Sequence, residues 1–251
     1  MFYRHLVGAS LSLVVIIMAA SVVGAQQAGL PPRVIATAPE QFAANVDPGL
    51  TSISVTFDRP MTTQGPFGFG SLRWAGVYPS TQDARASWSD DGVTCTLPVT
   101  LLPDVTYALT VNTSKGREFV SADGIAALNF ALVFATGERT EDDFPPYVVD
   151  CTPPQAAEGV DPALSEVTVT FNRPIAPGDH SWVLQQGSGQ YPGYRGGPPP
   201  TLSADRLSAT LPVRLAPNTV YSLGINDIVY FGYKDTKGRP LLPYGWSFKT
   251  R

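Results

Sequence analysis

The sequence is poor in the residues that most metal-binding and catalytic sites use. Its 251 residues include only two cysteines and two histidines, and only 15% of the chain is charged. A zinc centre needs several cysteine or histidine ligands, so this class of site is excluded. No run of lysine or arginine occurs, and nucleic-acid binding needs such a basic patch. We therefore expect no cofactor and no nucleic-acid partner.

The one long apolar run stands at the N-terminus. The short positive start MFYRH precedes the apolar segment 6–23, which ends in small residues before QQ. This is the pattern of a secretory signal peptide, here spanning 1–25. The segment also reaches the lower length limit of a membrane span, so a retained anchor is the alternative. In both cases we expect an exported chain that is periplasmic, extracellular or at the cell surface, with a membrane contact only through 6–23 if it is uncleaved.

The chain repeats itself at a spacing of 114 residues. The stretch ISVTFDRPM begins at residue 53, and its near copy VTVTFNRPI begins at residue 167. The longer stretches TLPVTLLPDVTYALTVN and TLPVRLAPNTVYSLGIN align at the same offset without a gap. A constant offset predicts two copies of one domain, at 33–137 and 148–251, joined by an acidic linker at 138–147. Copies of this size should be independent globules with separate cores.

Apolar and polar residues alternate within each copy. Ile53, Val55 and Phe57 share one face of an extended segment, and the second copy repeats the pattern at 167–171. A period of two predicts strands with one buried face, and the Arg-Pro pair that follows ends each strand. Turn signals such as Asp-Gly separate the strands, and no apolar stripe with helical spacing follows the N-terminal segment. The sequence predicts an all-β protein of two tandem antiparallel β-sandwiches after an N-terminal hydrophobic signal or anchor helix.

Two tyrosines carry a resemblance to a known family. Tyr107 and Tyr221 each follow a proline by four residues, in LLPDVTY and LAPNTVY, as in the tyrosine corner of Ig-like sandwiches. With the T-F-x-x-P strand and the closing F-x-T, each copy resembles the bacterial Ig-like domain first described in surface-layer proteins. The resemblance implies a structural and interaction module without catalytic residues. Both copies depart from the family in carrying Arg before the proline, at Arg59 and Arg173. The pair could bind a shared partner, and the alternative that we expect is that each pairs with a neighbouring acid.

Candidate chemistry outside this resemblance is sparse. Asp179, His180 and Ser181 are adjacent, but a catalytic triad needs its members to converge in space, and neighbours on an extended chain point apart. The copper-binding Ig-like proteins of the periplasm share the T-F-x-x-P strand. They use histidine ligands, however, and His180 is the only histidine after the signal segment. We expect no enzyme activity.

Two features leave alternatives open. The linker acids Glu141, Asp142 and Asp143 could supply oxygen ligands to calcium, and the alternative is a solvated acidic spacer. Cys95 and Cys151 could form a bridge between the two domains, since export permits disulfides. The alternative is that each thiol is a small buried hydrophobe.

The copies diverge most in their loops. In the second copy, QQGSGQYPGYRGGPPP (185–200) and IVYFGYKD (228–235) gather tyrosines. Loops at one end of a sandwich commonly carry binding surfaces, and Tyr and Arg dominate such contacts. We predict a binding surface built from these residues: Tyr191, Tyr194, Arg195, Tyr230 and Tyr233. The alternative is a hairpin whose tyrosines cover a sheet edge.

Two functions fit these observations. The first is a non-enzymatic, secreted or cell-envelope bacterial module that acts as a structural spacer, an adhesin or a subunit of an envelope assembly. Its partner would be an envelope or surface protein. The second is a carbohydrate-binding accessory domain pair that holds a polysaccharide through its aromatic loops.

Overall fold

The fold is all-β. The computed structural model describes residues 29–65, 67–113, 116–185, 187–193 and 196–251. The expected signal peptide or anchor at 1–25 lies outside these residues. Over the described ranges the chain forms strands β1 to β15 and one 3-10 helix, Glu141–Asp143, with no α-helix. The described part also contains no helix that is long and apolar enough to cross a membrane.

Each domain contributes one four-stranded antiparallel sheet. In domain 1 its strands are β1 (Val34–Ala38), β2 (Ser52–Phe57), β4 (Ser87–Trp88) and β5 (Thr94–Pro98). In domain 2 they are β8 (Val148–Thr152), β10 (Glu166–Phe171), β12 (Thr201–Leu202) and β13 (Ser208–Pro212). The orders β1-β2-β5-β4 and β8-β10-β13-β12 are equivalent, and each strand begins 114 residues before its counterpart. The sequence repeat is therefore a repeat of structure.

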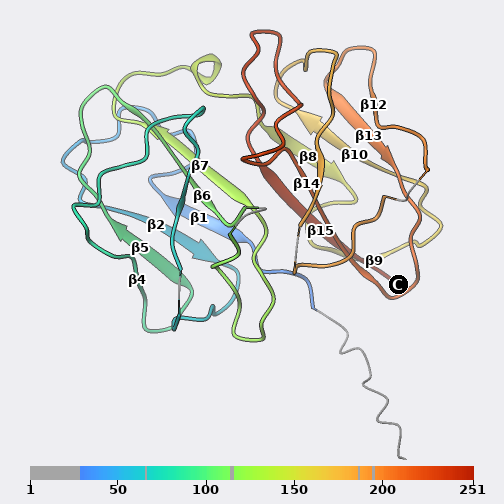
Figure 1. The fold of residues 1–251 in the computed structure, drawn as a ribbon, viewed down its shortest axis with the longest axis horizontal. Coiled ribbons are helices and arrows are strands. Elements are labelled where there is room, and N and C mark those ends of the chain that lie inside the picture. Colours follow the sequence, from blue (N-terminus) through green and yellow to red (C-terminus); the bar gives the residue numbers. More distant parts are fainter. Residues whose placement is uncertain (1–28, 66, 114–115, 186, 194–195) are drawn as a thin grey trace, which may run out of the picture.

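The second sheets of the two domains join into one. Domain 1 supplies β3 (Gly70–Ser71), β6 (Thr106–Val111) and β7 (Phe130–Ala135). Domain 2 supplies β11 (Trp182–Leu184), β14 (Val220–Ile225) and β15 (Tyr244–Thr250), with β9 (Ala157–Val160) running parallel to β15. The joined order is β11-β14-β15-β7-β6-β3. The domains lie side by side as a result (Figure 1).

The junction of this sheet is locally symmetric. Phe130 of β7 lies opposite Tyr244 of β15 in antiparallel register, and the amide of Gly245 donates to the carbonyl of Asn129 at 3.0 Å. Phe130 and Tyr244 are equivalent positions of the repeat, 114 residues apart. An antiparallel pairing of equivalent positions relates the two domains by an approximate two-fold rotation.

The alternating residues form the cores, as predicted. Ile53, Val55 and Phe57 on β2 are buried between the two sheets of domain 1. Val169 and Phe171 on β10 occupy the same places in domain 2. Their polar neighbours lie on the other face of each strand, because successive side chains of a strand point to opposite sides.

Both tyrosine corners are present. The hydroxyl of Tyr107 accepts a hydrogen bond from the amide of Leu102 at 2.6 Å, and that of Tyr221 accepts one from Ala216 at 2.6 Å. Each ring is buried in its own core. A bulky side chain with one polar end can satisfy a turn amide there without losing apolar contact.

The outer face of β7 is covered by a second apolar cluster to which domain 1, the linker and domain 2 all contribute. Ala131 and Val133 point away from the core of domain 1, yet both are buried in a cluster with Phe144 of the linker and Leu242 of domain 2. The domains keep separate cores, but they are not independent bodies. Small residues on the outer face of β7 let this second layer pack closely, and the period-two pattern of the sequence does not predict such a layer.

The two cysteines do not form a bridge. Cys95 lies on β5 in domain 1 and Cys151 on β8 in domain 2, and both thiols are free and buried. Burial raises the pKa of Cys95 to about 12 and that of Cys151 to about 11. Each cysteine acts as a small apolar core residue, so the alternative of an interdomain staple is wrong.

Candidate functional site

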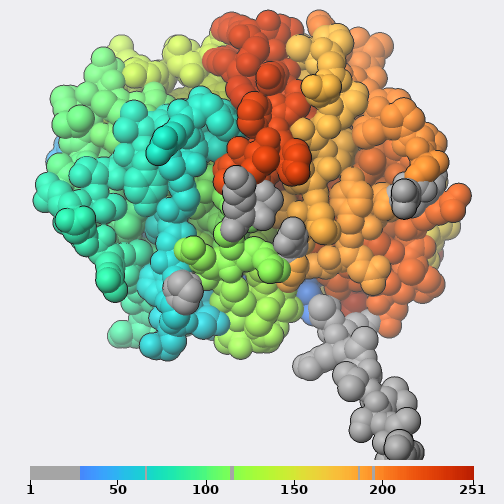
Figure 2. Space-filling view, viewed as in Figure 1, coloured from blue at the N-terminus to red at the C-terminus, as the bar shows by residue number. Residues whose placement is uncertain are grey.

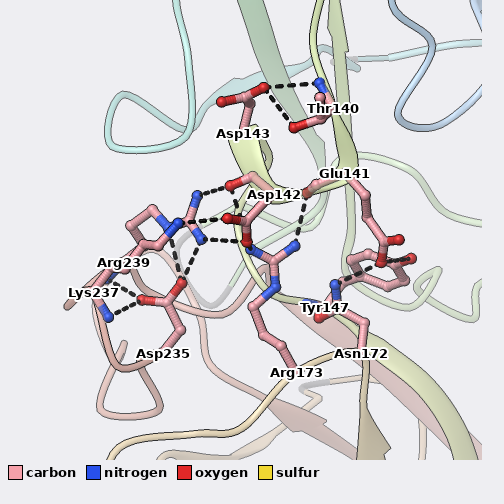
Figure 3. A network of polar contacts seen from close by, with 10 residues as sticks. All are labelled: Thr140, Glu141, Asp142, Asp143, Tyr147, Asn172, Arg173, Asp235, Lys237 and Arg239. Carbon is pink, nitrogen blue, oxygen red and sulfur yellow. Dashed lines mark hydrogen bonds and ion pairs between the residues drawn. The ribbon is translucent and has the colours of Figure 1, made fainter.

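Two regions of domain 2 carry the candidate functional residues: a network of charged side chains at the linker and a surface cleft. The first is the linker. There the carboxylate of Asp142 forms ion pairs with Arg173 at 3.0 Å and with Lys237 at 2.6 Å. Its backbone carbonyl accepts a hydrogen bond from Arg239 at 2.5 Å. Figure 3 shows these three cations converging on Asp142. Arg239 also pairs with the buried Asp235 at 2.7 Å. These interactions attach the linker to domain 2, and we call the group of Asp142, Arg173, Lys237 and Arg239 the charged clasp.

The two other acids of the linker have different partners. Glu141 accepts from the hydroxyl of Tyr147 and the amide of Asn172, both at 3.1 Å, while Asp143 accepts from Thr140. Hydrogen bonding lowers the pKa of Glu141, of Asp142 and of Asp143.

The carboxylates of the linker therefore do not converge on a common centre (Figure 3). Among the described residues, no group of three His, Cys, Asp or Glu side chains is placed to hold a metal ion. The arrangement does not match the calcium site considered from the sequence, because each carboxylate is already engaged by a protein donor.

The Arg-Pro motif takes the role expected of it. Arg59 pairs with Asp58 at 3.1 Å and donates to the carbonyl of Leu30 at 2.9 Å. Its counterpart Arg173 pairs with Asp142 and donates to the carbonyl of Glu141 at 2.7 Å. In each copy the guanidinium holds the segment that enters the domain.

The second region is a surface cleft of about 530 Å³ on domain 2. It runs between the segments 176–181 and 229–238. In the space-filling view the red segment that carries 229–238 lies along the boundary between the domains (Figure 2). Three consecutive apolar side chains stand exposed on this segment: Val229 (38%), Tyr230 (60%) and Phe231 (40%).

Short contacts hold the two walls of the cleft together. The amide of Gly232 donates to the hydroxyl of Ser181 at 2.8 Å. A Cβ at Gly232 would lie 2.8 Å from that hydroxyl oxygen and 3.0 Å from Asp179, so the close approach requires glycine. The ammonium of Lys234 lies 5.6 Å from the centre of the Phe231 ring, within the range of a cation–π contact.

The structure places the described residues of the predicted tyrosine surface in different environments. Tyr230 is exposed in the cleft, whereas Tyr233 is fully buried and accepts a hydrogen bond from Trp182 at 2.7 Å. Tyr191 packs partly buried against the core of domain 2, and burial raises its pKa to about 12. Tyr194 and Arg195 lie outside the described residues. Tyr233 is thus a core residue in this structure and not a contact residue, because Asn226 holds its backbone and Trp182 donates to its hydroxyl inside the domain.

No catalytic triad forms at Asp179, His180 and Ser181. The ring of His180 is 5.2 Å from that of Tyr233, and the hydroxyl of Ser181 is engaged by Gly232. Asp179 lines the cleft as an exposed carboxylate. The three side chains therefore serve packing and the cleft wall.

Sequence reasoning missed the apolar partners of Tyr230 and the polar wall of the cleft. Val229 and Phe231 stand in the quoted stretch IVYFGYKD, but only its tyrosines were selected. A comparison of the copies would have found them, since the positions equivalent to 229–231 carry Lys-Gly-Arg in the first copy. The polar residues Asp179 and Lys234 join the cleft only through the fold.

The comparisons with known proteins give one family. Residues 29–136 and 142–250 each match the family described as bacterial Ig-like domain, and no curated protein matches the chain.

Three solved structures of different kinds are among those that match this chain. CopC from Methylosinus trichosporium OB3b is 14% identical, over 42% of this chain and 92% of that chain, with a TM-score of 0.31. The S-layer protein rSbsC is 13% identical, over 85% of this chain and 26% of that chain, with a TM-score of 0.27. SGBP-B from a xyloglucan utilization locus in Bacteroides uniformis is 12% identical, over 79% of this chain and 47% of that chain, with a TM-score of 0.22.

The S-layer protein and SGBP-B are longer than this chain, which spans about a quarter of the S-layer protein and about half of SGBP-B. The family match covers most of the sequence in two consecutive segments that coincide with the structural repeat. The chain belongs to the bacterial Ig-like domain family and carries two tandem copies of its domain.

Proposed function

We propose that this protein is a non-enzymatic, exported binding module of the bacterial cell surface or envelope, in the role of an adhesin or of a subunit of an envelope assembly. The observation that carries the proposal is the junction of the two domains. The sheet that continues from β15 into β7 and the charged clasp at Asp142 hold both domains as one body.

Two domains held as one body are better suited to presenting a binding surface than to spanning a long distance. Two domains side by side extend less far than two domains joined only through a linker, so the role of a long spacer is disfavoured. The fixed junction instead holds the loops at one end of domain 2 in a constant position. Loops on a rigid scaffold are where sandwich proteins place their binding contacts.

The test uses the full chain in its source cell with a photo-reactive amino acid at one of two positions. Thr236 lies in the cleft wall, and Glu158 is exposed on β9, beside the far end of β15. We expect the protein in the exported fraction and cross-links to an envelope or surface component from position 236 only. Recovery in the cytoplasm, or equal cross-links from both positions, would contradict the proposal.

A further inference from the structure

The exposed run Val229, Tyr230 and Phe231 is an addition to a scaffold that both domains share. In domain 2 the loop that carries it is held by Asn226, whose side-chain amide donates to the carbonyls of Tyr233 and Leu241. In domain 1 the equivalent Asn112 makes the same bonds to Phe119 and Ala127. The anchors on both sides of the run are therefore the same in the two copies.

Within this loop, the two copies differ in the type of residue that lies between the anchors. The first copy carries Lys-Gly-Arg at 115–117, where the second carries Val-Tyr-Phe at 229–231. The first copy has the same anchors and carries no aromatic residue at these sequence positions, so the anchors do not require the rings. Three adjacent exposed apolar side chains that the scaffold does not need indicate a contact surface.

The chemistry around these rings narrows the class of ligand. The cleft also presents the carboxylate of Asp179, the ammonium of Lys234 and the hydroxyl of Thr236. Its volume of about 530 Å³ lies within the usual range of ligand sites. A sugar ring offers an apolar C–H face and a rim of hydroxyls that both donate and accept. Exposed rings beside a carboxylate and an ammonium match those two features together.

Other ligands match less well. A nucleic acid would need a basic patch, whereas the residues that line the cleft include one cation, Lys234, with the acids Asp179 and Asp235, and the chain has a net charge of −4. A purely apolar ligand would leave the carboxylate and the ammonium without partners, which costs binding free energy.

We infer that the cleft of domain 2 binds a segment of a polysaccharide, with Tyr230 and Phe231 as the stacking surface and Asp179 and Lys234 as hydrogen-bonding groups. This assignment rests on the proposed function, because it names the ligand class of the same surface. It predicts that the binding contacts lie in domain 2 alone.

The test is a glycan array followed by calorimetric titration of the full chain with oligosaccharides of the bound class. The variant Tyr230→Ser/Phe231→Ser removes both rings. The matched control Val149→Ser removes a half-exposed apolar side chain from β8 of the same domain. Because all three side chains lie at the surface, the thermal unfolding of each variant should stay close to that of the wild type.

We expect the wild type and Val149→Ser to bind the same glycan, and the double variant to bind it at least about tenfold more weakly, as for the loss of a contact hot spot. The inference is overturned if the wild type binds no glycan on the array or if the double variant binds equally well. If no glycan binds but the double variant loses the envelope protein that cross-links at position 236, the ligand class is wrong and the proposed function stands.

Discussion

Asn112 and Asn226 show how much of the architecture depends on single buried side chains. Each adopts a positive φ, at 48° and 52°, a region in which asparagine is among the few tolerated residues. Each side chain then closes a loop by donating two hydrogen bonds and accepting one. The repeated sequence displayed both asparagines, but a loop that closes on itself is visible only in three dimensions.

Substitution of Asn226 by Ala should lower the free energy of unfolding by about 3 kcal/mol, because two carbonyls and one amide lose their buried partner. Tyr221→Phe, which removes one hydrogen bond, should cost about 1 kcal/mol. Urea denaturation followed by fluorescence measures both values. An Asn226→Ala variant no less stable than Tyr221→Phe would show that the loop is not held by this residue.

The two thiols give a second prediction for single residues. Because burial raises the pKa of Cys95 to about 12 and that of Cys151 to about 11, neither forms the reactive thiolate near neutral pH. A thiol reagent at pH 8 should react slowly with the folded protein and rapidly with two groups per chain after denaturation without reductant. Absence of both groups from the denatured chain would instead indicate a disulfide.

Among the elements, the linker is the one whose structure differs most from the prediction made from the sequence. The sequence suggested either a calcium site or a solvated spacer. The structure instead clasps the segment to domain 2 through Asp142 and its three cations. Individual exposed ion pairs stabilise proteins little, but one carboxylate shared by three cations fixes the position of the 3-10 helix.

The clasp should depend on pH in a defined direction. The hydrogen bond and charge of Lys237 are the leading causes that lower the pKa of Asp142 from its ordinary value of 3.8. A group with a lowered pKa stabilises the folded state above its unfolded pKa and loses that effect as the pH falls through the folded value. Asp142→Asn should therefore lower the Tm at neutral pH, and the difference from wild type should shrink as the pH falls below 3.8 toward the lowered pKa of the folded state.

Thermal unfolding monitored by circular dichroism between pH 7 and pH 3 measures this difference. The exposed Asp90 provides the control, and Asp90→Asn should leave the Tm nearly unchanged across the range. A constant Tm difference between Asp142→Asn and wild type at all pH values would show that the variant acts through packing and not through charge.

At the scale of the whole molecule, the shared sheet and the cluster around Phe144 and Leu242 couple two domains that have separate cores. Coupling of this kind predicts a single cooperative unfolding transition in which the calorimetric and van't Hoff enthalpies agree. It also predicts that damage to the junction, unlike damage to either core, separates the transitions.

The variant Leu242→Asp places a charge in the buried junction, where it has no cation among the residues of the cluster. We expect differential scanning calorimetry to resolve two transitions for this variant, because a buried unpaired charge costs several kcal/mol. Leu102→Asp, at a side chain that is 63% exposed, should keep one transition. Two transitions in the wild type would show that the domains unfold independently.

The strands, their repetition and the tyrosine corners can all be predicted from the amino-acid sequence. The alternation at Ile53, Val55 and Phe57 and the ungapped 114-residue offset are properties of the chain, and a period of two can bury one face only as a strand. The prolines before Tyr107 and Tyr221 likewise mark turns that these tyrosines cap. Each of these features depends on residues that are close together in sequence, or on two similar copies that adopt the same fold.

How the two copies meet and which aromatic residues face solvent depend on contacts between distant segments of the folded chain. The pairing of Phe130 with Tyr244, the ion pair of Arg173 with Asp142 and the covering of β7 by Leu242 join residues from separate segments, which local periodicity does not relate. The same holds for Tyr230, which is exposed, and Tyr233, which is buried. Three residues apart in one tyrosine-rich stretch, they differ because Asn226, Trp182 and Gly232 fix the direction of that segment against the rest of domain 2.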